Sequence, residues 1–444
     1  MIDKRLQLGV LVGLAAVVVA AIVWWGLPRI VAALPGRARH YVPAALIELA
    51  TTPLPTALPA PAEPAPAALE LALASAIPLP TPTLRATSAL AAPIVSDAAT
   101  PFPTALPPTL IPKPTTASLP PYGRIDNLPI IPQKFNNCGP TNLTIVLNHY
   151  GIDVDQFDVA AVARPNYEDR NVSPDELVRY VREHTPLSAA TYVGGDLDQL
   201  RRLIAAGFPV IIEQGLEPDE ATGWMGHYLT VYGYDDITRH LLVRDTYLGP
   251  WRGDGLASYS DTERYWAQFS GAFIVVYPPE REAELAGILG AMAGDPAAMW
   301  SAAADRARAA VTLEPDDAFA WFNLGSSLTA LAGLGDTALY QGAAAAYDQA
   351  RLLGLPARMV WYQFGPYEAY LAVGRPADVL ALADSTLANQ GGRNVEETYY
   401  YQGRALALTG DWAGARAAFE QAAALNPDSV VGRAALAALQ DAPG

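Results

Sequence analysis

The pattern of apolar and polar positions divides the chain into four parts with different predicted structures. Residues 8–27 are an uninterrupted apolar run, and a helix needs about 20 such residues to cross the hydrocarbon core of a bilayer. We therefore predict a transmembrane signal anchor within residues 1–34. The small residues Ala32 and Ala33 keep a cleaved signal peptide open as an alternative.

Proline, alanine and threonine dominate the next part, residues 35–121, where charged and aromatic side chains are scarce after residue 50. A segment of this composition cannot bury a hydrophobic core of its own. We predict a semi-extended spacer between the anchor and the folded part of the chain.

Patterned segments begin at Tyr122 and continue to residue 279. Helical spacing of apolar residues predicts helices over 138–150, 174–184 and 196–207, and Ser173 and Glu176 predict a capping box for the second. Runs of β-branched and aromatic residues predict strands at 209–214, 227–234, 240–247 and 273–277. Helices followed by strands indicate an α+β domain over residues 122–279.

Residues 280–444 are rich in alanine and repeat a signature in which an aromatic residue precedes a glycine by four positions. The pairs are Trp321 and Gly325, Trp361 and Gly365, and Tyr399 and Gly403. Their spacing resembles the tetratricopeptide repeat, a pair of helices, and the last copy fits best. We predict about three repeats that form an all-α domain with few contacts to the domain before it.

Charge and cysteine content exclude several classes of function. The formal net charge is −16, so the surface repels the phosphates of nucleic acid, and we expect no nucleic-acid partner. Cys138 is the one cysteine, which excludes an intrachain disulfide and a zinc site built from several thiolates. No metal-ligand spacing or phosphate-binding glycine loop occurs, and we expect neither a metal nor a cofactor.

Cys138 begins the first predicted helix of the α+β domain. A lone cysteine is more often buried and inert, but the unpaired N–H groups and the dipole at a helix N-terminus stabilise a thiolate. Gln133, five residues upstream, can project its amide toward the same helix end and help the Cys138 N–H to hold an oxyanion. Cys138 is therefore a candidate nucleophile and Gln133 a candidate oxyanion donor.

A thiol nucleophile needs a base, and His227 is the best placed of the five histidines. Two glycines, Gly223 and Gly226, precede it at the start of a predicted strand, a position that suits the mouth of a cleft. If segments 227–234 and 240–247 form a hairpin, His227 and Asp245 become a cross-strand pair in which the carboxylate orients the imidazole.

Residues from about 127 to 277 resemble the bacteriocin-leader-processing, double-glycine type peptidases, which are papain-like. The resemblance rests on Gln133, the sequence Cys138-Gly-Pro, His227-Tyr and Asp245. It implies a papain-like fold in which these residues are the oxyanion donor, nucleophile, general base and orienting acid. Gln133 stands five residues before Cys138, whereas six is more usual in that family.

We therefore expect a membrane-anchored cysteine peptidase that hydrolyses peptide bonds and whose helical repeats recruit a substrate or a protein partner. A catalytically inactive peptidase fold that serves as a binding module is the alternative. Pro/Thr-rich stalks behind a single span are commoner outside the cytoplasm, so we expect a single-pass protein of the cell membrane with its folded part extracytoplasmic.

Overall fold

The computed structural model describes residues 57–62, 119–219, 222–249 and 255–441, and the isolated residues 26, 30, 31, 34, 42 and 73. Within this part of the chain, no helix is both long enough and apolar enough to span a bilayer. The anchor predicted at residues 8–27 lies outside the described residues, apart from Gly26.

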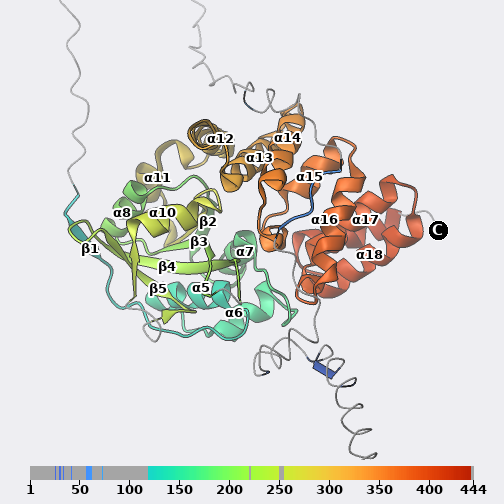
Figure 1. The fold of residues 1–444 in the computed structure, drawn as a ribbon. Helices are drawn as coiled ribbons and strands as arrows, with labels where there is room; N and C mark the ends of the chain where they lie inside the picture. Colours follow the sequence, from blue (N-terminus) through green and yellow to red (C-terminus); the bar gives the residue numbers. More distant parts are fainter. Residues whose placement is uncertain are drawn as a thin grey trace, which may run out of the picture.

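A seven-stranded sheet forms the centre of the first domain (Figure 1). The order along the sheet is β2 (Ser188–Tyr192), β7 (Phe273–Tyr277), β3 (Val210–Leu216), β4 (Met225–Asp235), β5 (His240–Asp245) and β6 (Leu256–Ser258), and β1 (Tyr122–Arg124) pairs with the end of β4. Each of these pairings is antiparallel. The four predicted strands correspond to β3, β4, β5 and β7.

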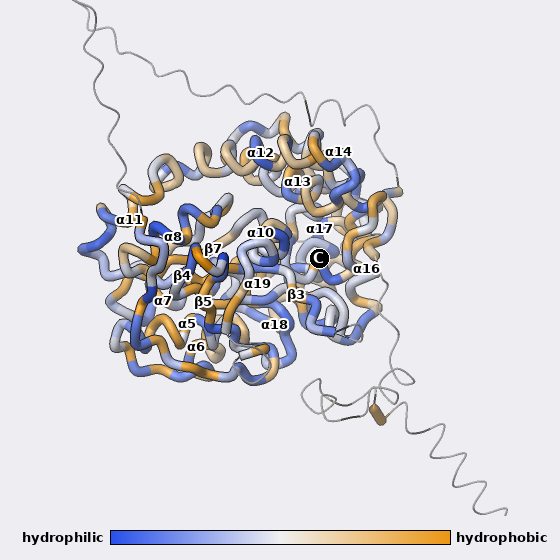
Figure 2. The backbone as a smooth tube through the Cα atoms, turned by 60° about the vertical axis from the view of Figure 1, so that its left-hand side comes forward, coloured by the Kyte–Doolittle hydropathy of each residue, from blue (hydrophilic) through white to orange (hydrophobic). Residues whose placement is uncertain are grey.

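Helices cover both faces of this sheet. One face packs against α5 (Cys138–His149), α6 (Gln156–Ala163) and α7 (Pro174–His184) through a buried cluster that includes Tyr228 and Ile274. The other face packs against α8 (Leu197–Ala205), α10 (Tyr259–Ala267) and α11 (Glu282–Leu289). Figure 2 shows hydrophobic segments of the chain where α5, β5 and β7 lie. The predicted capping box is present at the start of α7.

The second domain is a row of helices in which each packs on the next. They are α12 (Pro296–Leu313), α13 (Ala318–Gly333), α14 (Leu339–Leu353), α15 (Gly365–Ala372), α16 (Pro376–Ala388), α17 (Glu396–Leu408), α18 (Trp412–Leu425) and α19 (Val430–Asp441). The signature glycines allow close packing within a repeat. A Cβ atom at Gly325 would lie 2.7 Å from the Tyr347 ring, and one at Gly403 would lie 2.7 Å from the Phe419 ring.

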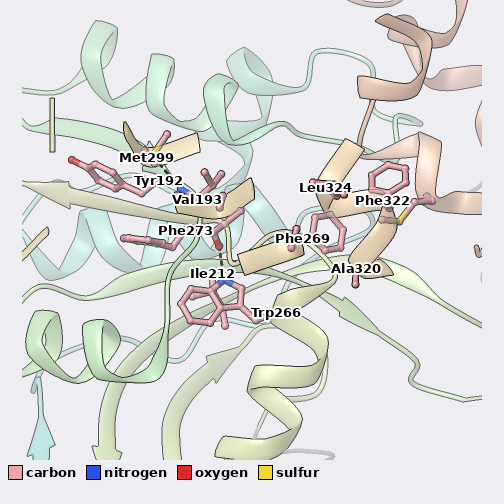
Figure 3. Packing of buried hydrophobic residues seen from close by; sticks show 14 of the residues in the cluster. Tyr192, Val193, Ile212, Trp266, Phe269, Phe273, Met299, Ala320, Phe322 and Leu324 are labelled. Carbon is pink, nitrogen blue, oxygen red and sulfur yellow. Dashed lines mark hydrogen bonds between the residues drawn. The ribbon is translucent and has the colours of Figure 1, made fainter. Parts of the chain in front are cut away.

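The two domains share one hydrophobic core, so the expectation of few contacts between them is wrong. Trp266 and Phe273 of the sheet domain belong to the same buried cluster as Phe322 and Leu324 of α13 (Figure 3). A side-chain hydrogen bond crosses the boundary as well, because Asn323 Nδ2 donates to the Ala267 carbonyl at 2.6 Å. The architecture therefore changes near residue 280, but the core continues across it.

Residues 57–62 are a described part of the predicted spacer, and they pack against the second domain. This short segment lies against the repeats (Figure 1, blue), and the Leu58 side chain is only 5% exposed. The Leu58 N–H donates to the Leu355 carbonyl, which follows α14, at 2.9 Å. The composition of the spacer excludes a core of its own, but it does not prevent one of its leucines from packing against another domain.

Candidate active site

Cys138 is the first residue of α5, and its thiol is half-buried at the N-terminal end of that helix. Asn137 provides no side-chain cap and the first turn contains no acidic residue, so the positive end of the helix is not neutralised. Burial raises the pKa of the Cys138 thiol, but His227 and the backbone N–H groups of Tyr228 and Gly139 outweigh burial and lower that pKa below its ordinary value. The site therefore favours the thiolate.

His227 lies near the start of β4, and its side chain is almost completely buried. Its Nε2 is 3.0 Å from Asp245 Oδ1, which leaves Nδ1 to face the Cys138 thiol. Burial lowers the pKa of His227, but Asp245 and Cys138 together raise it to about 10. The lowered pKa of Cys138 and the raised pKa of His227 both favour a thiolate–imidazolium pair, whose two groups titrate as a unit.

The register of the β4–β5 hairpin differs from the predicted one. Asp245 pairs with Leu229 rather than with His227, because the turn lies later than predicted and β4 contains a β-bulge at Tyr232, before the turn. His227 is two residues from Leu229, so it shares a face with Asp245 as a diagonal neighbour. Without the bulge, Asp245 would pair with Thr230 and point to the opposite face from His227. The bulge therefore makes their hydrogen bond possible.

Asp245 ends β5, where the following turn holds its carboxylate in place. Its Oδ1 accepts hydrogen bonds from the backbone N–H groups of Tyr247 and Leu248, at 2.9 and 2.8 Å. Burial raises the pKa of Asp245, but His227 and these two N–H groups lower it below its ordinary value. The carboxylate is therefore ionised next to the imidazolium.

Gln133 lies beside the same pair of strands, where a hydroxyl orients its amide. Thr246 Oγ1 accepts from Asn142 Nδ2 at 3.2 Å and donates to Gln133 Oε1 at 2.9 Å. Since Oε1 is the acceptor of this bond, the Nε2 donor of Gln133 points away from Thr246. The backbone agrees with this placement, because the Gln133 N–H donates to the Thr246 carbonyl at 2.9 Å.

Asn142, which we did not predict as a site residue, connects the three elements of the site. Its Nδ2 donates to the carbonyls of Cys138 and Tyr228, at 2.9 and 2.8 Å, in addition to Thr246. Its Oδ1 accepts from Thr230 Oγ1 at 2.8 Å. An asparagine one helical turn from the apolar Ile145 and Val146 is the sequence signal that could have indicated this role.

The repeats contribute a wall to the cavity beside Cys138. This cavity has a volume of about 10 Å³, room for about one water molecule. Gly226 and Tyr228 of β4 line it, and Tyr362 lines it from the loop between the 3₁₀ helix Ala357–Trp361 and α15. The wall of this cavity is therefore made by both domains.

Glu213 of β3 also lines this cavity and is buried. Burial raises its pKa to about 8, with Cys138 adding to the effect and a hydrogen bond with Tyr228 opposing it. The side chain is therefore mostly neutral at pH 7 and does not oppose the thiolate. Within the described residues, no group of three or more His, Cys, Asp or Glu side chains is placed to hold a metal ion.

Comparisons with known proteins agree with these two domains. Residues 124–274 match the model of the Peptidase_C39 like family, and residues 396–429 match the tetratricopeptide repeat. The resemblances to double-glycine type peptidases and to tetratricopeptide repeats are thereby confirmed. No curated protein matches the chain.

Two solved structures are similar to the first domain. A protein from Bacillus anthracis, described as a C39-like peptidase, is 18% identical, with 35% of this chain and 96% of that chain covered and a TM-score of 0.28. A double glycine motif protease from an AMS/PCAT transporter, in complex with a leader peptide, is 20% identical, with 35% and 94% covered and a TM-score of 0.27.

Proposed function

We propose that this protein is a cysteine peptidase that hydrolyses peptide bonds, with Cys138 as nucleophile and His227 as acid and base. The observation that supports this proposal best is the arrangement of three side chains: Cys138 at the N-terminus of α5 interacts with His227, and His227 hydrogen-bonds to Asp245. In this arrangement the pKa of the Cys138 thiol is lowered and the pKa of the His227 imidazole is raised, as a nucleophile and a proton donor require.

In the proposed reaction the Cys138 thiolate attacks the peptide carbonyl carbon, and the C–O π electrons move to the oxygen. The His227 imidazolium then gives its proton to the leaving amine as the C–N bond breaks, which leaves a thioester on Cys138. Neutral His227 next takes a proton from water, whose oxygen attacks the thioester and releases the acid and the thiolate. Asp245 holds Nε2 throughout, which keeps Nδ1 directed at the sulfur.

We assign Gln133 Nε2 and the Cys138 backbone N–H to the oxyanion that forms in both steps. The Thr246 hydroxyl supports this role because it occupies the amide oxygen of Gln133. Asn142 is a positioning residue, because it joins the start of α5 to β4 and β5.

The test compares the purified full chain with its Cys138→Ala and Cys138→Ser variants on a mixture of unstructured peptides, with new N-termini identified by mass spectrometry. We expect cleavage by the parent alone and near-equal melting temperatures for all three, since a half-buried thiol at a cleft contributes little to packing. Asp245→Asn is expected to keep more activity than His227→Ala, because the imidazole remains.

The alternative is a catalytically inactive peptidase fold that serves as a binding module. The small volume of the cavity beside Cys138, which Tyr362 lines, favours this alternative. It would replace the proposal if the parent cleaved nothing and Cys138→Ala lowered the free energy of unfolding by about 2 kcal/mol or more, as truncation of a core side chain does.

We further propose that residues 8–27 anchor the chain in the cell membrane with its folded part outside, and that the repeats recruit a substrate or a protein partner. The apolar run and the Pro/Thr-rich spacer support the anchor. A protease added to intact cells is expected to remove the folded part. Protection until lysis would place that part in the cytoplasm.

A further inference from the structure

Main-chain groups of the segment 57–62 are held by two charged side chains of the repeats. Arg351 of α14 donates from Nε to the Pro59 carbonyl at 2.8 Å and from Nη2 to the Ala60 carbonyl at 3.0 Å. Asp378 of α16 accepts the Ala62 N–H on Oδ1 at 2.9 Å. The Leu58 N–H also donates to the Leu355 carbonyl. The repeats therefore bind both N–H groups and carbonyl groups of the extended segment.

The charged side chains of Arg351 and Asp378 belong to a buried network of ion pairs. Arg351 and Asp378 are 3% and 1% exposed, and Arg351 Nη1 lies 2.8 Å from Asp378 Oδ1. Arg375 holds the other carboxylate oxygen of Asp378 at 2.7 Å and pairs with Asp348 at 2.7 Å. Buried charges are costly unless each polar atom has a partner, and the linker segment supplies partners to three such atoms: Arg351 Nε, Arg351 Nη2 and Asp378 Oδ1.

The pattern of contacts also fits the residues that the segment carries. The site accepts the N–H groups of Leu58 and Ala62, whereas Pro59 and Pro61 have none to give. Proline fixes an extended backbone in advance and so reduces the entropy that binding costs. The buried Leu58 side chain provides the apolar contact.

We propose that these residues of α14 and α16 form a binding site for extended Leu-Pro peptides, occupied in this chain by residues 57–62. The site fastens the linker to the repeats in cis. The sequence Pro-Thr-Ala-Leu-Pro at 55–59 recurs at 103–107 of the same linker, which provides a matched position for comparison. The site is separate from Cys138, and its test needs no peptidase activity.

The test measures backbone amide hydrogen exchange at Leu58 and Ala62 in the full chain, held in detergent micelles. We expect both amides to exchange at least tenfold more slowly than in a free peptide of residues 55–63. Leu58→Ser should remove this protection without disturbing the fold of the repeats, because it changes only the linker. Leu106→Ser, at the equivalent position of the second copy, should leave the protection of Leu58 and Ala62 as in the parent.

A competition experiment tests the selectivity of the site. Excess synthetic peptide of residues 55–63 should raise the exchange rate of Leu58 in the parent, whereas the same peptide with serine in place of Leu58 should not. The proposal would be overturned if Leu58 and Ala62 of the parent exchanged as fast as the same residues in the free peptide. Unchanged protection in Leu58→Ser, or equal competition by the two peptides, would also overturn it.

Discussion

A Cβ atom at Gly226 would lie 2.9 Å from the ring of Tyr362, so the residue before His227 is in direct contact with the repeats. The neighbouring Trp224 meets the same ring edge-on, with centroids 5.9 Å apart. Arg358 Nη1 also donates to the Trp224 carbonyl, at 3.2 Å. The strand that bears the proposed base therefore begins against the second domain.

Tyr362→Ala should open the cavity beside Cys138. The measurement is the alkylation rate of Cys138 by iodoacetamide and by a bulky maleimide. We expect the ratio of the bulky to the small reagent's rate to rise severalfold in Tyr362→Ala, because the wall that excludes the larger group is gone. Tyr362→Phe keeps the ring and serves as the control. An unchanged ratio in both variants would show that Tyr362 does not limit access.

A chain that ends after residue 279 should not fold stably. The truncation exposes the aromatic side chains of Trp224, Phe269 and Phe273 to a greater extent, and burial of one large apolar side chain contributes about 1.5 to 3 kcal/mol. A typical domain is stable by only about 5 to 15 kcal/mol. Near-ultraviolet circular dichroism during thermal unfolding checks this. A cooperative transition near that of the full chain would contradict it.

Thr246→Val should lower kcat/KM by about tenfold while KM changes little, because the Gln133 amide loses the hydroxyl that orients it. Gln133→Ala should cost about 2.7 to 4 kcal/mol of transition-state stabilisation, the range for an oxyanion donor. If Thr246 acts through Gln133, the double variant should be about as active as Gln133→Ala alone. Additive losses would show that Thr246 acts by another route.

Four buried carboxyl groups at a second contact between the domains should make stability depend on pH. They are Asp169 and Glu176 of the first domain and Glu396 and Glu397 of α17. Burial, followed by the nearby Glu396 charge, raises the pKa of Glu176 to about 7. Burial likewise raises the pKa of each of the other three, and Asn426 Nδ2 donates to Glu176 Oε1 at 3.1 Å across the contact.

The raised pKa values determine whether the free energy of unfolding rises or falls with pH. Between about pH 4.5 and 7 the folded chain keeps the Glu176 proton that the unfolded chain has released, so the free energy of unfolding should fall as pH rises. Glu176→Gln should remove at most about 3 kcal/mol of this dependence. Denaturant unfolding at several pH values measures it, and Glu183→Gln, an exposed position in α7, is the control. If the free energy of unfolding changed with pH equally in the parent and in Glu176→Gln, the expectation would be contradicted.

The sequence predicted the elements that have strong local patterns and missed the features that depend on distant partners. The helix after Cys138 and the capping box of Ser173 and Glu176 are local, and both are present. The strand β2 is short and partly made of small residues, so no alternation marked it. The bulge at Tyr232 brings Asp245 to the same face of the sheet as His227. The predicted register was counted from an assumed turn, and such a count cannot reveal a bulge.

The shared core escaped prediction for a related reason. Trp224 and Tyr362 are far apart in sequence, and each alone looks like an ordinary aromatic residue in a loop. Asn142 was recognisable as polar on an apolar helix face, but its partners Tyr228 and Thr246 are identified only by the folded strands.

The docked segment 57–62 changes how far the folded part can stand from the N-terminal region. Residues 35–121 would give a leash of up to about 300 Å at about 3.5 Å per residue. With residues 57–62 fastened to the repeats, only residues 35–56 remain as the leash, and its greatest length falls to roughly 75 Å. The remainder, from residue 63 to the start of the first domain, becomes a closed loop between two points on one body. Release of Leu58 would therefore lengthen the leash about fourfold without any change in the covalent chain.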